Sequence, residues 1–294
     1  MFSYSVCSVI IISEIEIPGG YDSFFIKKVN LENNSIHDFG EADITILRED
    51  KTHVAQNLIM VSKLQYMYIF GNISHKNSFR WVYEATNGVC SLAISADYSL
   101  AKYDYADILG SVSREELGKI AGPFFQVLLE CKLVQKEFSI LHASCIDING
   151  SAYAFVGPSG IGKSSRARKW IELFSAEWIS GDRPAIDVTS GTVYGVPWDG
   201  KEAIYRNVNR PLDAILKVTR SEKTFIKIMS DEEKFQLLCE QSFIPMWDPI
   251  LAAKAMHSLK KLIRMVPIFE LGCDITDAST YKAKELITDA LKGQ

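Results

Sequence analysis

A glycine-rich segment near the middle of the chain sets the strongest limits on its fold. It reads Gly157-Pro158-Ser159-Gly160-Ile161-Gly162-Lys163-Ser164 and matches the pattern G-x-x-x-x-G-K-[ST]. The apolar run Ala152–Val156 leads into it, and a helical segment over 162–174 follows. A strand, a glycine-rich loop and a helix in this order predict a phosphate-binding loop within an α/β domain.

Each part of this segment has a predicted task. Glycines let successive backbone N–H groups converge on one anion, and the N-terminus of the helix adds a partial positive charge. Lys163 would reach the β- and γ-phosphates of a nucleotide, and the Ser164 hydroxyl is a hard oxygen ligand that suits Mg²⁺. We therefore predict that residues 157–165, Ser165 included, bind a nucleotide. A glycine-rich turn before an ordinary helix would explain neither Lys163 nor Ser164.

A nucleotide site also needs a group that holds the metal or activates a nucleophile. A carboxylate of this kind usually ends an apolar strand, and Asp182 does so in the segment Trp178-Ile179-Ser180-Gly181-Asp182. Asp187, inside the next predicted strand, is the alternative carboxylate. Taken alone, Asp182 could equally be an aspartate of a solvated turn.

The chain has 294 residues and changes character near residue 110. Before that point, β-branched and aromatic segments alternate with turn signals, and Asn87-Gly88 predicts a hairpin. A helix over 113–135, opened by a capping box, precedes an α/β pattern. We predict a β-rich N-terminal domain over 1–110 and an α/β domain over 111–294, with the helix 113–135 as connector.

The predicted elements can be stated by residue range. In the N-terminal part the predicted strands are 2–13, 24–29, 43–48, 56–61, 66–72, 79–85, 90–95 and 99–103. In the second part the predicted strands are 138–148, 152–156, 177–180, 185–188, 193–195, 214–218, 224–228 and 266–271. The predicted helices there are 162–174, 230–240, 247–263 and 277–291.

The composition narrows the range of partners. Thirty-two basic and 36 acidic residues give a net charge of −4, so the chain lacks the basic field of a nucleic-acid-binding protein. Six cysteines form no C-x-x-C pair, which disfavours a zinc site and a disulfide scaffold. The apolar runs are too short to span a membrane, and Val9–Ile12 has the pattern of a strand. We expect a cytoplasmic protein with neither nucleic acid nor membrane as partner.

Three short motifs together resemble the motifs of a known family. They are Leu141-His142-Ala143-Ser144, the loop Gly157–Ser164, and Gly181-Asp182. From about residue 138 to its end the chain resembles the C-terminal domain of HPr serine kinase/phosphorylase. The likeness is strongest to the shorter HPr-kinase-like proteins of bacterial peptide-modification clusters, including the lasso-peptide kinases. Their β-rich N-terminal part also resembles residues 1–105.

The resemblance implies a fold and an activity. The fold would be an α/β P-loop kinase core, HPr kinase/phosphoenolpyruvate carboxykinase-like, preceded by a β-rich N-terminal domain. The activity would be the ATP-dependent phosphorylation of a serine hydroxyl, with ATP and Mg²⁺ as cofactors and a peptide or protein as partner. Asp182 would accept the proton and, with Ser164, hold the metal. The resemblance also raises His142 from a half-buried histidine to a candidate catalytic residue beside Lys163.

The sequence departs from the family pattern at one position. The usual acidic pair is Gly181-Asp182 here, so the first of the two acids is absent. Glu202 could supply a second carboxylate. Arg210 is a candidate catalytic residue that would stabilise the transferring charge, as is Arg206, although a surface ion pair is the simpler interpretation of each.

Several alternatives remain open at this point. The acceptor could be a small hydroxylated molecule such as free serine, and Gly181 favours a nucleotide-binding regulatory protein without transfer activity. The N-terminal β module could bind a peptide by strand addition or only cap the α/β domain. The sequence carries no signal for adenine and none for the oligomeric state.

Overall fold

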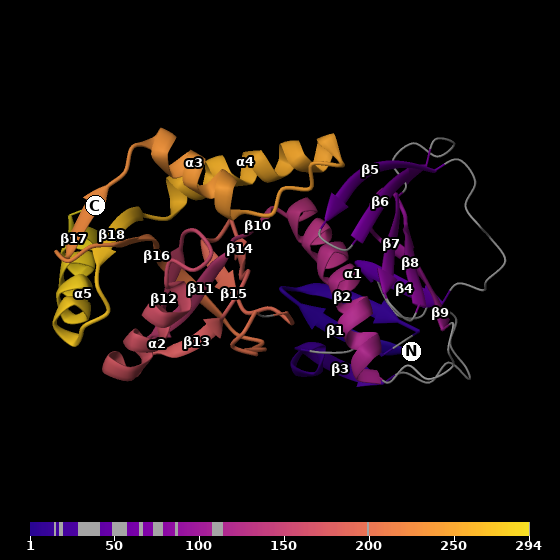
Figure 1. Ribbon diagram of the computed structural model, residues 1–294, viewed down its shortest axis with the longest axis horizontal. Helices are drawn as coiled ribbons and strands as arrows, with labels where there is room; N and C mark the ends of the chain where they lie inside the picture. The colour runs from indigo at the N-terminus through magenta and orange to yellow at the C-terminus, as the bar shows by residue number, and fades with distance from the viewer. Residues whose placement is uncertain are drawn as a thin grey trace. The chain divides into compact units, whose positions relative to one another are not determined.

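The computed structural model describes residues 1–14, 16–17, 20–28, 42–48, 58–64, 67–72, 79–85, 88–107, 114–198 and 200–293. These residues form two compact units of mixed α/β structure, each built on an open sheet (Figure 1). The first unit comprises 1–135 and 245–252, and the second comprises 136–244 and 253–294.

The first unit is a mixed sheet with one long helix. The strand order is β3-β1-β2-β4-β9-β8-β7-β6-β5, and helix α1 packs on β7 and β8. The elements are β1 (Phe2–Val6), β2 (Val9–Ser13), the 3-10 helix η1 (Gly20–Phe24), β3 (Phe25–Lys28), β4 (Ile44–Arg48), β5 (Leu58–Leu64), β6 (Met67–Asn72), β7 (Phe79–Ala85), β8 (Gly88–Ile94), β9 (Leu100–Asp107) and α1 (Arg114–Gln135).

Two predictions for this unit need correction. The predicted strand 2–13 is a hairpin, because Cys7 and Ser8 take left-handed backbone angles (φ 51° and 62°) and turn β1 back onto β2. The helix predicted as a connector of the second domain belongs to the first unit, where side chains such as Phe124 and Leu128 are buried. The pairing predicted for the hairpin at Asn87-Gly88 is confirmed, because β7 and β8 are antiparallel neighbours, while Asn87 itself lies outside the described residues. The capping box predicted at the start of the helix lies outside the described residues.

The second unit is also a mixed sheet, and helices cover both of its faces. The strand order is β10-β14-β15-β16-β12-β11-β13, with β18 paired to both β16 and β17. Its elements are β10 (Phe138–Ile140), β11 (Ala143–Ile148), β12 (Ser151–Val156), α2 (Lys163–Phe174), β13 (Glu177–Ser180), β14 (Ala185–Asp187), β15 (Thr192–Tyr194), β16 (Asn209–Arg220), β17 (Phe225–Ile228), α3 (Asp231–Gln241), α4 (Pro249–Met265), β18 (Ile268–Cys273) and α5 (Asp277–Lys292).

Successive side chains along the strands point to opposite faces of this sheet. They pack into two hydrophobic cores, one on each face. On β12, Phe155 packs with Trp170 of α2 and Ile287 of α5. Its neighbours Ala154 and Val156 point the other way, into a core that also holds residues of α3 and α4. This alternation is what a strand buried on both faces requires. Helices α2 and α5 therefore cover one face, and α3 and α4 cover the other.

The predicted strand 138–148 is broken at the point where it reaches the glycine-rich loop. Strand β10 pairs with β14, and β11 pairs with β12, so the chain changes partners at Leu141 and His142. Leu141 forms an isolated bridge with Ser242, and the N–H of His142 donates to the carbonyl of Gln241 at 2.6 Å. The break holds His142 beside the C-terminal end of β12.

The other predicted elements of the second unit are confirmed with small changes at their ends. The largest difference is β16, which begins at Asn209, five residues before the predicted strand 214–218. Within the described residues no helix is both long enough and apolar enough to cross a membrane.

Candidate functional site

The glycine-rich loop connects β12 to α2, as predicted. Gly157, Gly160 and Gly162 have φ angles of 141°, 78° and 110°, which side-chain-bearing residues rarely adopt. A Cβ on Gly157 would also lie 3.3 Å from the Ile161 Cγ2, which is closer than most Cβ contacts in proteins. The loop conformation therefore depends on glycine at these positions. Pro158 to Gly160 form the exposed part of the loop, and Ser165 is exposed on the first turn of α2.

Lys163 is folded back over the loop. Its side chain is only 9% exposed, and its Nζ donates to the carbonyl of Gly157 at 2.9 Å and to that of Pro158 at 3.4 Å. Burial lowers the pKa of Lys163, and the nearby charge of Asp182 opposes this shift. The loop thus holds an ammonium group in place before any ligand arrives, next to the N-terminus of α2.

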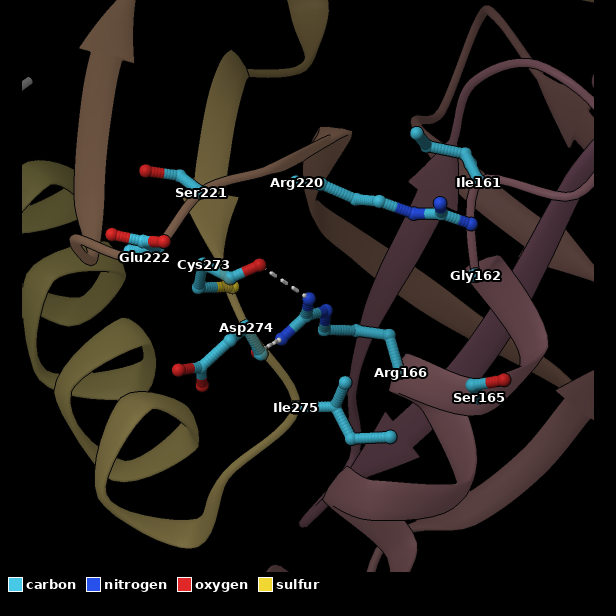
Figure 2. A pocket seen from close by; sticks show the side chains of 10 residues that line it. All are labelled: Ile161, Gly162, Ser165, Arg166, Arg220, Ser221, Glu222, Cys273, Asp274 and Ile275. Atoms are coloured by element: carbon cyan, nitrogen blue, oxygen red, sulfur yellow. Dashed lines mark hydrogen bonds between the residues drawn. The ribbon is translucent and has the colours of Figure 1, made fainter.

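A pocket of about 570 Å³ opens beside this loop (Figure 2). Ile161, Gly162 and Ser165 line it on the side of the loop and α2. The ends of β16 and β18 and the residues that follow them line the other side, because both strands run parallel to β12. Ligands of open α/β sheets usually bind at this carboxyl end of the strands.

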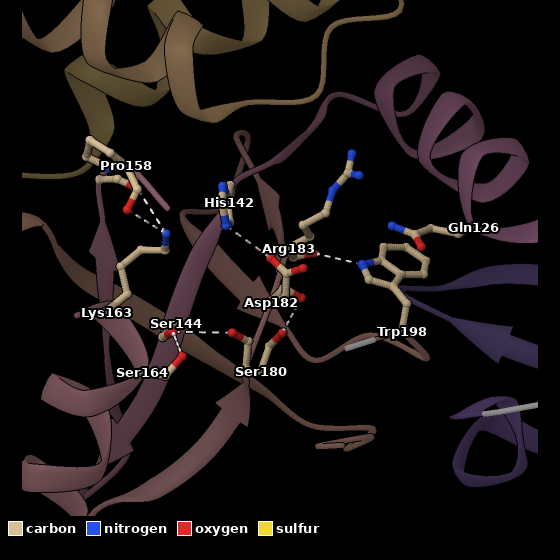
Figure 3. A network of polar contacts seen from close by, with 12 residues as sticks. Gln126, His142, Ser144, Pro158, Lys163, Ser164, Ser180, Asp182, Arg183 and Trp198 are labelled. Atoms are coloured by element: carbon tan, nitrogen blue, oxygen red, sulfur yellow. Dashed lines mark hydrogen bonds and ion pairs between the residues drawn. The ribbon is translucent and has the colours of Figure 1, made fainter. Parts of the chain in front are cut away.

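Ser144 connects the start of α2 to the segment that carries Asp182. Its fully buried hydroxyl lies 3.2 Å from the Ser164 Oγ and donates to the carbonyl of Gly181 at 3.2 Å (Figure 3). Ser180 in turn donates to the carbonyl of Asp182 at 2.9 Å. These bonds bring the predicted metal ligands Ser164 and Asp182 to one side of the loop.

His142 and Asp182 face each other within this network, with 3.7 Å between the histidine Nε2 and the Asp182 Oδ1. Burial lowers the pKa of His142, and the charges of Lys163 and Arg183 lower it further, while Asp182 acts in the opposite direction. His142 is therefore neutral near pH 7 and can accept a proton. The Asp182 Oδ1 is buried and has no hydrogen-bond partner among the described residues, as expected for an atom that awaits a ligand.

A second pocket, of about 340 Å³, lies on the side of this pair. His142, Asp182 and Arg183 line it together with residues 240–243 at the end of α3. The Arg183 guanidinium lies over the Phe243 ring at 5.4 Å, and its backbone has a left-handed φ of 54°. The chain therefore turns sharply after Asp182 and leaves the carboxylate at the wall of the pocket.

The structure does not bring Arg210 to this site. Arg210 lies at the start of β16, and its Nε is 2.5 Å from the Asp147 Oδ2 on β11. Because β12 and β16 are parallel and the loop follows the end of β12, Arg210 lies at the opposite end of the sheet. Arg206 pairs with Glu177 at 2.9 Å instead. Both arginines are thus in ion pairs, the alternative that the sequence had left open.

The other two candidate carboxylates, those of Glu202 and Asp187, contact other residues instead of His142 and Asp182. Glu202 is ion-paired with Arg168 on the exposed side of α2. Asp187 accepts hydrogen bonds from Thr189 and Ser190 in the turn after β14. Asp182 is therefore the carboxylate that the structure places next to His142 and Lys163.

Sequence reasoning missed several polar residues of this region. Ser144 ends the motif Leu141–Ser144, but the sequence assigned it no role. Arg183 could have been found from the sequence, because it directly follows the candidate residue Asp182. Arg166 and Arg220 line the larger pocket. Arg166 directly follows the predicted loop segment, but its partner Cys273, like the partner Gly160 of Arg220, is distant in the chain.

Replacing Ser144 by alanine should lower the free energy of unfolding by about 1 kcal/mol, because two buried hydrogen bonds are lost. Ser139→Ala is the matched control, since the Ser139 hydroxyl is equally buried but has no partner among the described residues. That control should be neutral or slightly stabilising. Urea denaturation measures both, and equal effects of the two variants would contradict the assigned role of Ser144.

The lowered pKa of His142 predicts a pH dependence of stability. The unfolded chain protonates this histidine below about pH 6.5, whereas the folded chain resists protonation until a lower pH. Stability is therefore lost as the pH falls through that window. Because the side chain is partly exposed, the loss should be under about 1 kcal/mol. His142→Gln should show a smaller loss in denaturation curves at about pH 7.5 and 5.5, and an unchanged loss would disprove the assignment.

The sequence itself was also compared with known proteins. No protein-family model and no curated protein matches the chain.

Proposed function

We propose that this chain is an ATP-dependent kinase that phosphorylates a serine hydroxyl of a peptide or protein. One observation carries the proposal. The buried Lys163 at the start of α2 lies close enough to the His142–Asp182 pair for its charge to act on both groups, and Ser144 joins Ser164 to the segment that carries Asp182. Phosphoryl transfer needs charge neutralisation and positioning of the acceptor more than covalent chemistry. The proposed fold relation to HPr kinase and phosphoenolpyruvate carboxykinase rests on the resemblance of the motifs.

The loop would hold the phosphate donor. Its backbone N–H groups and Lys163 would bind the β- and γ-phosphates of ATP. Ser164 and Asp182 offer hard oxygen atoms for Mg²⁺, and the Oδ1 of Asp182, which accepts no hydrogen bond from the described residues, fits this role. Bound Mg²⁺ would supply neutralisation of phosphate charge. No group of three metal-ligating side chains occurs among the described residues, but Mg²⁺ commonly takes one or two protein oxygens together with phosphates.

The His142–Asp182 pair would act on the serine hydroxyl that accepts the phosphate. A serine hydroxyl that enters the pocket of about 340 Å³ meets Asp182 and His142 at its wall. Asp182 would take the hydroxyl proton while the serine oxygen bonds to the γ-phosphorus, and the bond to the bridging oxygen breaks to release ADP. Neutral His142 would orient Asp182 or receive the proton from it.

A second candidate acceptor is a small hydroxylated molecule such as free serine. The modest volume of the pocket that contains the pair, about 340 Å³, favours it. Such a ligand would be held between Arg183 and Glu240. The reaction and the roles of Lys163 and Asp182 would be the same.

The test is a transfer assay with γ-labelled ATP and Mg²⁺. The acceptors are the peptide or protein encoded beside this chain, the same peptide with its serines replaced by alanine, and free serine. Mass spectrometry of the products should show phosphoserine in the peptide. Labelled free serine would favour the small-molecule candidate. Nucleotide binding without transfer to any acceptor would overturn the kinase proposal and favour a regulatory protein.

A further inference from the structure

The pocket beside the glycine-rich loop has no role in the proposed transfer of the γ-phosphate to the serine hydroxyl. Its volume of about 570 Å³ is in the range of small-ligand sites. Ile161 and Gly162 belong both to the loop and to the lining of the pocket. A molecule whose phosphates occupy the loop would therefore extend naturally into it.

The walls combine apolar and hydrogen-bonding groups. Ile161 lies on the loop side and Ile275 on the opposite side (Figure 2). Ile275 is 57% exposed, which leaves a large aliphatic surface at the mouth of the pocket. Glu222 lines the pocket and makes no hydrogen bond or ion pair with the described residues, so its carboxylate can accept from ligand hydroxyls.

Arg166 forms a rigid floor between α2 and β18. It is 5% exposed, and its two terminal nitrogens donate to the carbonyls of Cys273 and Asp274 (Figure 2). Its Nε is buried without a partner among the described residues. A buried donor of this kind calls for a polar ligand atom or a water molecule.

Arg220 lines the pocket on the side of the glycine-rich loop. It ends β16, and its Nη2 donates to the carbonyl of Gly160 at 2.8 Å. This bond fixes the guanidinium beside the loop. The pocket is thus cationic toward the loop, carries a carboxylate at Glu222, and has aliphatic surfaces at Ile161 and Ile275. These groups together offer contacts for phosphate, ribose and base.

We infer that this pocket takes the nucleoside of the nucleotide, with the base against Ile275 and Ile161 and a ribose hydroxyl donating to Glu222. The inference rests on the proposed binding of nucleotide phosphates by the loop. It adds to that proposal the position of the nucleoside and a preference for ribonucleotides. Ile275 and Glu222 are then binding residues that no motif marks.

The experiment compares two ligands, ATP and inorganic tripolyphosphate, each with Mg²⁺, by calorimetry on the full chain. Ile275→Ala should weaken ATP binding about tenfold through lost apolar contact and leave tripolyphosphate binding unchanged. Ile228→Ala is the matched control, because Ile228 is 72% exposed and does not line the pocket. It should alter neither affinity. Both isoleucines are exposed, so both variants should fold, which thermal melting checks.

A second variant tests the ribose contact independently. The native chain should bind ATP more tightly than 2′-deoxy-ATP or 3′-deoxy-ATP, and Glu222→Gln should reduce that preference. Unchanged ATP affinity in Ile275→Ala, with tripolyphosphate still bound, would place the nucleoside elsewhere and leave the proposed function intact. If the native chain binds neither ATP nor tripolyphosphate, the proposed function fails and this inference fails with it.

Discussion

Replacing Lys163 by alanine is expected to lower kcat/KM for phosphate transfer from ATP by at least about 10²–10³-fold. The ammonium group is buried and held by two loop carbonyls, so no other side chain can take its place without rebuilding the loop. ATP and tripolyphosphate should both bind much more weakly. Initial rates of transfer and calorimetry measure the two effects.

Lys169→Ala is the control for this result. Lys169 lies on the same helix, but its Nζ pairs with Glu172 and Asp277. Loss of these ion pairs should leave transfer and nucleotide binding nearly unchanged, because surface pairs contribute little. If Lys163→Ala kept full activity, the loop would not be the phosphate site.

Replacing Asp182 by asparagine should lower kcat by about 10²–10⁴-fold while the protein stays folded. The side chains have the same shape, and the buried Oδ1 makes no hydrogen bond that the substitution would break among the described residues. Tripolyphosphate binding without Mg²⁺ should persist, since Lys163 and the loop are untouched. Rates at saturating ATP, with melting curves, give the result.

Asp187→Asn separates the two carboxylates considered from the sequence. Asp187 supports the turn that follows β14 by accepting from Thr189 and Ser190. Its replacement should lower stability slightly and leave kcat unchanged. The reverse outcome, in which Asp187→Asn stops transfer and Asp182→Asn does not, would overturn the proposed roles.

The local part of this site was predictable from the sequence. The strand, loop and helix around Lys163 are contiguous, and the two glycines that the motif specifies, Gly157 and Gly162, take the positive φ angles that favour glycine. Asp182 could be found because it ends an apolar strand. The periodic helices of the second unit were likewise recognisable.

The parts that depend on strand pairing were not predictable in the same way. The sequence predicts a strand only from residue 214, whereas β16 begins five residues earlier and includes Arg210. Its partner Asp147 is 63 positions away in the chain, and no local pattern reports such a contact. The pocket beside the loop has the same origin, because Arg220 and Arg166 reach it only through the alignment of β12, β16 and β18.

Strand β16 also determines how the second unit can open. It pairs with β15 at its start, with β12 over residues 212–217 and with β18 over residues 215–220. Amide protons near Ile215 and Leu216 are therefore enclosed by neighbours on both sides and should exchange with solvent only when the whole sheet separates. A single peptide from this strand would then report the cooperative unfolding of the second unit, independently of the first.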